Sequence, residues 1–215
     1  MPSHRGVVGV AVLAALAGAA ASLFFEPTVA YRLAGTALGQ QVLGATLKAR
    51  APAPPAGVAV AQPGATVPPM TLRDVAGTAV EVPRAWAGRP TLVNLWASWC
   101  APCLKEMPDL QAFSTAQRPN GVQVVGIALD DAPAVQAFLR QHGIAYPVLV
   151  DAPGPADAGV RLGNPAGVLP YSVLVSADGR LQKTRIGPFA DAAEIARWAD
   201  ADAPAQTPGP AAGGH

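Results

Sequence analysis

The two cysteines of the chain, Cys100 and Cys103, are the residues whose type and spacing most clearly indicate chemistry. They stand in the run Trp-Cys-Ala-Pro-Cys, directly after an apolar, strand-like segment from Thr91 to Ala97. Two cysteines at positions i and i+3, where a strand turns into a helix, can close and reopen a small disulfide by thiol–disulfide exchange. A bridge across so short a loop constrains the unfolded chain very little, so stability is a poor reason for it. The pattern therefore predicts redox chemistry.

A zinc site is the alternative for such a pair, because zinc commonly takes two of its ligands from a CxxC motif. Zinc would need two further ligands, and the histidines are His4, His142 and His215. His4 precedes an apolar segment, His215 ends a tail rich in proline and glycine, and His142 lies where a predicted helix C-terminus favours a cation. We therefore expect no metal and no cofactor other than the redox-active disulfide Cys100–Cys103.

The composition of the 215 residues predicts one ordinary domain with extensions. A net charge of +1 and 13% charged residues offer no basic surface for nucleic acid. Much of the proline and glycine lies in residues 51–69 and 203–215, which is typical of an unstructured linker and tail. We accordingly predict a signal anchor or signal peptide (1–26), a stalk with a Pro/Ala-rich linker (27–65), a folded domain (66–200) and a disordered tail (201–215).

A charge-free stretch from Gly6 to Phe25 follows Arg5 and indicates export. About 20 apolar residues suffice to cross a bilayer as a helix, and Arg5 favours a cytoplasmic N-terminus. A cleaved signal peptide, with small residues before Ser22, is the alternative. We favour an uncleaved anchor because the apolar run continues to Phe25. A second charge-free stretch, 33–47, is short and contains three glycines, so we expect a loosely amphipathic stalk helix rather than a second crossing.

The predicted elements that position the cysteines form an α/β domain. Apolar patterning and turn residues predict strands at 70–74 and 78–82 (a pair), 91–97, 122–129, 148–151, and 172–176 with 181–186 (a hairpin). Helices are expected at 100–117, 132–142 and 191–200. Pro108 lies inside the first helix and should kink it. Asp130-Asp131 is expected to cap the second helix, Gly143 to end it, and Asp191 to cap the third.

Three sequence blocks resemble the thioredoxin superfamily, and within it the exported TlpA/ResA-like (DsbE-like) branch of thiol–disulfide oxidoreductases. They are Leu-Val-Asn-Leu-Trp-Ala-Ser-Trp-Cys-Ala-Pro-Cys with the following Lys-Glu-Met-Pro, then Val-Gly-Ile-Ala-Leu-Asp-Asp, and finally Gly-Val-Leu-Pro-Tyr-Ser-Val-Leu-Val. The resemblance implies a thioredoxin-like fold, with a central mixed sheet, helices on both faces and an N-terminal β-hairpin, here preceded by an N-terminal apolar helix. The active site would lie where the strand carrying Asn94 meets its helix.

Cys100 is the expected nucleophile, because a helix N-terminus favours a thiolate and lowers the thiol pKa. Cys103, one turn later, would resolve the mixed disulfide. Asn94 stands where thioredoxin carries a buried carboxylate, and an asparagine cannot exchange a proton. Glu106 follows Cys103 by three positions on the same helical face, and the resemblance implies that it manages the proton of this site. A solvated position on the helix surface is the alternative for Glu106.

The resemblance also predicts residues that bind the substrate. Pro170 matches the cis-proline that faces the cysteine pair in this fold, and Leu169 before it would pair with an extended substrate segment. Trp99, beside Cys100, is expected at the exposed lip of the site, whereas Trp96 is expected in the core. Tyr171 could line the groove or simply pack.

The expected function is that of an exported enzyme, a protein thiol–disulfide oxidoreductase that reduces disulfides in client proteins. The resemblance implies clients in cytochrome c maturation or copper-site assembly, and a membrane electron donor of the DsbD/CcdA type. We expect a monomeric soluble domain at the inner membrane, single-pass and facing the periplasm, or a soluble periplasmic protein if the signal is cleaved. The alternatives are an oxidant or isomerase using the same site, and a copper-delivery or redox-sensing module. A peroxiredoxin-type peroxidase would need a cysteine outside such a pair.

Overall fold

A computed structural model describes residues 36–117 and 121–200 of the chain. The predicted N-terminal apolar helix and the predicted C-terminal tail lie outside these residues. Helix α3 (Ala37–Arg50) lies within the segment predicted as stalk and linker. Its first turn is capped by Thr36, whose Oγ1 accepts a hydrogen bond from the Gly39 N–H at 3.1 Å. Among the described residues, no helix has the length and apolar character that crossing a bilayer requires.

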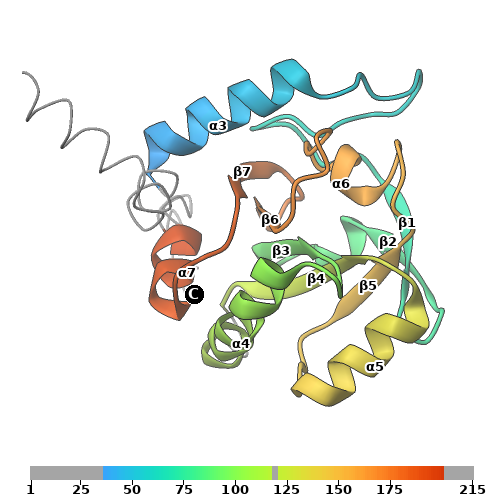
Figure 1. Ribbon diagram of the computed structural model, residues 1–215, viewed down its shortest axis with the longest axis vertical. Helices are drawn as coiled ribbons and strands as arrows, with labels where there is room; N and C mark the ends of the chain where they lie inside the picture. Colours follow the sequence, from blue (N-terminus) through green and yellow to red (C-terminus); the bar gives the residue numbers. More distant parts are fainter. Residues whose placement is uncertain (1–35, 118–120, 201–215) are drawn as a thin grey trace, which may run out of the picture. The chain divides into compact units, whose positions relative to one another are not determined.

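A seven-stranded mixed sheet forms the centre of the domain, in the order β2-β1-β5-β4-β3-β6-β7 (Figure 1). The strands are β1 (Met70–Asp74), β2 (Ala79–Val82), β3 (Thr91–Trp96), β4 (Gln123–Leu129), β5 (Val148–Asp151), β6 (Tyr171–Val175) and β7 (Leu181–Ile186). β3, β4 and β5 run parallel to one another, while β1 with β2, β1 with β5, β3 with β6 and β6 with β7 are antiparallel. The predicted strands are all present.

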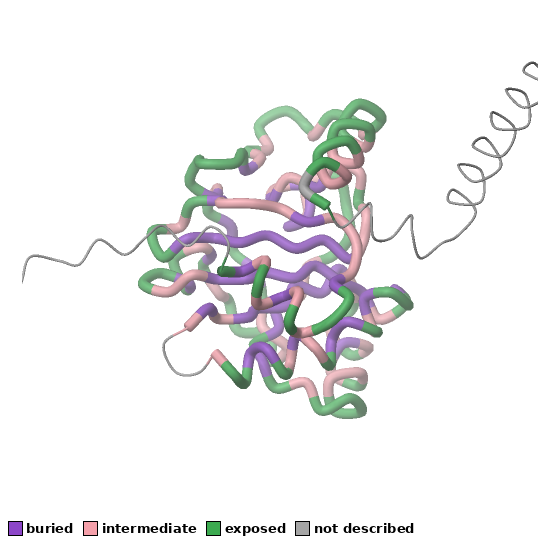
Figure 2. Tube along the Cα trace, turned by 90° about the vertical axis from the view of Figure 1, so that its left-hand side faces the viewer, coloured by how far each residue is buried: buried purple, intermediate pink, exposed green. Residues whose placement is uncertain are grey.

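Every residue of the central strand β3 is buried, because the sheet is covered on both faces. Leu92 and Trp96 belong to one hydrophobic cluster, and Val93 and Leu95 belong to the other. Asn94 has the parity of Leu92 and Trp96, so its side chain faces the same layer as theirs. Figure 2 shows buried tube running through the middle of the domain, with exposed loops around it, while the outer strands β2 and β7 are only partly buried.

The helices divide between the two faces of the sheet. Buried residues of α4 (Ala101–Ala116), α5 (Ala132–His142) and α7 (Ala192–Asp200) lie in the cluster that contains Trp96 and both cysteines. The opposite cluster contains residues of the short helix α6 (Ala158–Arg161) and Trp86 of the 3-10 helix η1 (Arg84–Trp86). The expected arrangement, a mixed sheet with helices on both sides, is confirmed.

The ends of the helices follow the local signals of the sequence. Cys100 is the N-cap of α4, and Pro102 lies in its first turn, where a missing N–H leaves no helical hydrogen bond unmade. Asp131 caps α5 by accepting from the Ala134 N–H, and Gly143 ends it in the left-handed conformation, with φ of 64°. Asp191 accepts from the Glu194 N–H at 2.7 Å at the start of α7. Pro108 lies inside α4.

Part of the segment predicted as linker is instead attached to the domain. Ala61 and Val67 are buried in the cluster of the α6 face. The Ala61 N–H donates to the Arg161 carbonyl at 2.7 Å, and the Val67 N–H donates to the Gly179 carbonyl at 2.9 Å. The prediction that 51–69 is unstructured was therefore wrong for residues 61–67. The composition of this segment does not indicate its main-chain hydrogen bonds to α6 and to the β6–β7 turn. The helices α6 and η1 were also not predicted.

Candidate active site

The Cys100–Cys103 disulfide lies at the N-terminus of α4, directly beyond the end of β3. The residue Cys100 is 5% exposed, Cys103 is fully buried, and the intervening Ala101 and Pro102 are exposed. The first turn of α4 directs unpaired N–H groups and the positive end of the helix dipole toward Cys100. This environment favours a thiolate on Cys100 after reduction.

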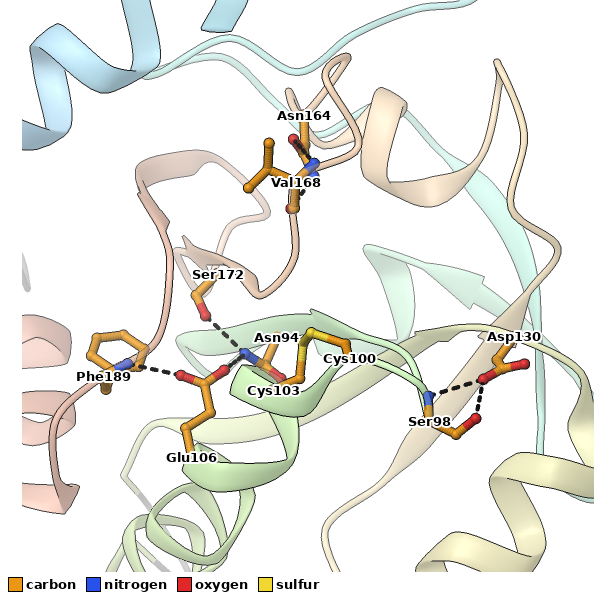
Figure 3. The surroundings of a disulfide bond; sticks show 10 residues. All are labelled: Asn94, Ser98, Cys100, Cys103, Glu106, Asp130, Asn164, Val168, Ser172 and Phe189. Atoms are coloured by element: carbon orange, nitrogen blue, oxygen red, sulfur yellow. Dashed lines mark hydrogen bonds between the residues drawn. A yellow bond between two sulfur atoms is a disulfide. The ribbon is translucent and has the colours of Figure 1, made fainter. Parts of the chain in front are cut away.

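Glu106 is buried on the side of α4 that faces β3, with only 1% of its surface exposed. Its Oε1 accepts a 2.8 Å hydrogen bond from Asn94 Nδ2, and its Oε2 accepts one of 2.8 Å from the Phe189 N–H. Asn94 Nδ2 also donates to Ser172 Oγ at 3.1 Å (Figure 3). The network connects α4, β3, β6 and the loop before α7. The alternative that Glu106 is a solvated helix residue is therefore wrong.

The pKa of Glu106 is raised to about 7, mainly because burial removes water from the charged carboxylate. Hydrogen bonds from Phe189 and Asn94 and the positive charge of Arg185 oppose this effect, but they do not cancel it. A carboxyl with a pKa of about 7 can accept or donate a proton near neutral pH, which is the property expected of a general base beside a thiol.

Arg185 of β7 is a charged residue behind this network that the sequence analysis did not single out. It is 5% exposed, and its Nη2 lies 3.0 Å from Glu194 Oε1 and donates to the Pro188 carbonyl at 2.9 Å. Its guanidinium also stacks 4.4 Å from the centre of the Phe189 ring. Arg185 thus holds the main chain at Pro188, and the N–H of the following residue, Phe189, donates to Glu106. An isolated arginine in a hairpin strand carries no sequence signal for this role.

The loop before Cys100 is held by Asp130, at the end of β4. Asp130 Oδ2 accepts hydrogen bonds from the Ser98 N–H at 2.9 Å and from Ser98 Oγ at 2.6 Å (Figure 3). Burial alone would raise the pKa of Asp130, but these bonds and those from Asp131 lower it. The prediction that the Asp130-Asp131 pair caps α5 is correct for Asp131 and wrong for Asp130, because strand β4 ends beside Ser98.

Pro170 and Leu169 lie at the same edge of the sheet as the disulfide. The pairing of Leu95 with Tyr171 brings the start of β6 beside the end of β3, from which Cys100 follows. The Leu169–Pro170 peptide bond is cis, and the Leu169 side chain packs against the cluster that contains both cysteines. The structure therefore places the two residues at the end of the sheet from which Cys100 follows, and their role in substrate binding stays a prediction.

The aromatic residues near the site differ in exposure. Trp99 is 69% exposed next to Cys100, whereas Trp96 is fully buried in the core. Tyr171 is buried, and its hydroxyl donates to the Leu162 carbonyl at 3.3 Å, so it packs rather than lining a groove. In residues 36–117 and 121–200, no group of three His, Cys, Asp or Glu side chains is placed to hold a metal ion.

Comparison with known proteins finds similarity across the whole domain. The Redoxin family model matches residues 62–199. Thiol-disulfide oxidoreductase ResA of Bacillus thuringiensis (strain Al Hakam) is 30% identical over 129 residues, which cover 59% of this chain and 70% of ResA. Sporulation thiol-disulfide oxidoreductase A of Bacillus subtilis (strain 168) is 26% identical over 133 residues, covering 60% of this chain and 76% of the relative.

Solved structures show the same similarity. StoA from Bacillus subtilis superposes with a TM-score of 0.50 at 26% identity, covering 63% of this chain and 98% of StoA. A thioredoxin family thiol:disulfide interchange protein from Chlorobium tepidum TLS superposes with a TM-score of 0.52 at 28% identity, covering 66% of this chain and 97% of that protein.

Proposed function

Because the chain belongs to the Redoxin family and is a thiol–disulfide oxidoreductase, we propose that its Cys100–Cys103 pair reduces disulfide bonds in client proteins outside the cytoplasm. The observation that carries the proposal is the carboxyl of Glu106, which is buried on the helix that follows Cys100 and is hydrogen-bonded to Asn94 of β3. Its pKa of about 7 suits it to take a proton from a thiol.

The proposed cycle begins with both cysteines reduced. The Cys100 thiolate attacks one sulfur of a client disulfide, and the other client sulfur leaves as a thiolate that takes up a proton. Glu106 then accepts the Cys103 proton, and the Cys103 thiolate attacks Cys100 Sγ. This step closes the Cys100–Cys103 disulfide and releases the second client sulfur as a thiolate, which is protonated as Glu106 gives its proton back. The client gains two electrons and two protons, which a dithiol of a membrane electron donor of the DsbD/CcdA type restores to the protein.

We also propose that the reaction takes place in the periplasm. The charge-free run from Gly6 to Phe25 after Arg5 supports an N-terminal anchor in the inner membrane with the domain in the periplasm. The resemblance to the TlpA/ResA-like branch supports clients in cytochrome c maturation or copper-site assembly.

Trapping tests the clients directly. The Cys103→Ala variant lacks the resolving thiol, so it should accumulate client proteins linked to Cys100 through a disulfide. Cys100→Ala is the matched control, because it keeps one cysteine in the same helix but lacks the nucleophile. Client capture by Cys100→Ala at the same level would refute the assigned order of attack.

The reduction potential tests the direction. For a reductant we expect a reduction potential of the Cys100–Cys103 pair well below about −200 mV, whereas strong disulfide oxidants lie near −120 mV. A value near −120 mV would assign the site to disulfide formation instead.

A further inference from the structure

The side chain of Asn164 is hydrogen-bonded to both main-chain groups of Val168. Asn164 Nδ2 donates to the Val168 carbonyl at 2.8 Å, and the Val168 N–H donates to Asn164 Oδ1 at 3.2 Å (Figure 3). Asn164 is only 4% exposed, and its own carbonyl accepts from the Gly167 N–H at 3.1 Å. The carboxamide therefore does for Val168 what a residue of a neighbouring strand does in a β-sheet.

The chain is equally fixed on the other side of Leu169. The Pro170 carbonyl accepts from the Gly187 N–H at 2.9 Å, and Tyr171 is paired with Leu95 in the sheet. Between these supports, the main-chain N–H and C=O of Leu169 form no hydrogen bond with any of the described residues. One donor and one acceptor are thus left open at the end of the sheet from which Cys100 follows.

The direction of these open groups follows from the backbone. A residue before proline is restricted to extended conformations, so Leu169 continues an extended segment. In such a segment, the main-chain groups of successive residues point to opposite edges. Because Asn164 holds Val168 from one edge, the groups of Leu169 are directed toward the other.

We propose that Asn164 is a positioning residue that pre-forms a one-residue docking edge at Leu169 for an extended peptide segment next to the client disulfide. This inference rests on the proposed function, since it assumes that clients are polypeptides. Holding the segment before binding reduces the conformational entropy lost when the client pairs with it. Asn164 therefore acts on client affinity and leaves the exchange chemistry unchanged.

Steady-state kinetics of the full chain test the proposal with two disulfides. The first is an extended peptide that contains a disulfide, and the second is dipyridyl disulfide, which has no peptide main chain. Asn164→Ala should raise KM for the peptide about tenfold, the value of roughly one hydrogen-bonded pair. Its kcat with the peptide, its rate with dipyridyl disulfide and its reduction potential should equal those of the wild type.

A second peptide, N-methylated at the residue that would pair with Leu169, separates docking from folding. For the wild type, N-methylation should raise KM about tenfold, whereas for Asn164→Ala it should add little, because that variant no longer holds the edge in place. Asn164→Asp keeps the acceptor for the Val168 N–H but loses the donor, and should give an intermediate KM if Asn164→Ala fails to fold.

An unchanged peptide KM in these variants would overturn the proposal, and so would an equal slowing with dipyridyl disulfide. The exchange is reversible, so the same KM comparison can be made with peptide dithiols and the oxidised protein. A potential near −120 mV would therefore refute the reducing direction while the Asn164 comparison still decides the docking edge.

Discussion

The carboxamide of Asn94 donates a 2.8 Å hydrogen bond to the carboxylate of Glu106 and so joins the central strand to the helix that carries both cysteines. Asn94 cannot take a proton, but it orients the group that can. The bond stabilises the ionised form of Glu106, and burial favours the neutral form. Their balance leaves the pKa near 7, where a change in the surroundings alters the charge of the site.

The first prediction concerns Glu106 and the pH dependence of stability. In the folded protein the carboxyl keeps its proton up to about pH 7, whereas its ordinary pKa is 4.5. The native state therefore binds more protons between these values. The free energy of unfolding should fall by roughly 3 kcal/mol as pH rises through this range. Glu106→Gln should lack this part of the fall, as measured by denaturant unfolding at about pH 4.5 and about pH 8. An equal change in the free energy of unfolding between the two pH values for wild type and variant would show that Glu106 does not have the raised pKa.

The same substitution should slow turnover, because glutamine cannot accept the Cys103 proton. We expect a loss of about 10²-fold or more at neutral pH, the lower end of what a positioned general base contributes. The titration of the two thiols should shift as well. Equal rates for the variant and the wild type from about pH 5 to about pH 9 would exclude Glu106 from proton transfer.

Asn94→Asp should place a second carboxyl against Glu106. Two carboxylates in contact do not both ionise readily, so the pair should retain one proton to a pH well above 7. The variant should lose stability at about pH 8 and much less at about pH 5. Ser172→Ala is the matched control, because it removes the other partner of Asn94 without adding charge. It should cost about 1 kcal/mol at both pH values.

Asp130 should stabilise the loop before Cys100 only while it is ionised. Its pKa lies below the ordinary 3.8, so its contribution is present above that value and is lost as pH falls through the lower native pKa. Asp130→Ala should reduce the free energy of unfolding by about 1–3 kcal/mol at neutral pH. Ser98→Ala, which removes the hydroxyl donor alone, should cost less. If Asp130→Ala is as stable as the wild type at pH 7, the two bonds to Ser98 do not support the loop.

Trp99 should contribute to client binding and little to folding. Its side chain is 69% exposed, so Trp99→Ala should change stability by no more than about 0.5 kcal/mol. KM for a peptide disulfide should rise several-fold, because an exposed indole beside Cys100 offers apolar surface to the client. Lys105→Ala, at an exposed position of α4, should alter neither quantity. A stability loss above 2 kcal/mol for Trp99→Ala would show that the indole packs in the fold.

Gly126 should not tolerate a methyl group. A Cβ there would lie 3.0 Å from Trp96 Nε1 and 3.2 Å from Val148 Cγ2, both within the core. Gly126→Ala should therefore destabilise the protein by about 1–3 kcal/mol. Gly154→Ala is the control, since a Cβ there meets no atom within 4 Å, and it should be close to neutral. Thermal unfolding of the two variants compares them directly.

The sequence by itself determined the features that depend on local physical chemistry. The apolar run from Thr91 to Ala97 predicts a strand buried on both faces, and the motif after it predicts the helix that begins beyond Cys100. Asp131 and Gly143 give the two ends of α5, because caps act on the nearest turn. These signals require no knowledge of distant residues, and they determined the α/β order and the redox pair.

Only the tertiary structure decided what surrounds that pair. Phe189, 83 residues away, supplies the second hydrogen bond of the buried Glu106 carboxyl, and helical spacing alone does not distinguish this position from a solvated one. Asp130 binds Ser98 across 32 residues, and Asn164 holds Val168 in the loop between α6 and β6. Such contacts depend on how the strands are ordered in the sheet, which no short-range pattern encodes. The cysteine pair is therefore visible in the sequence, and the resemblance adds Glu106 and Leu169, while the contacts that hold these residues in place exist only in the folded protein.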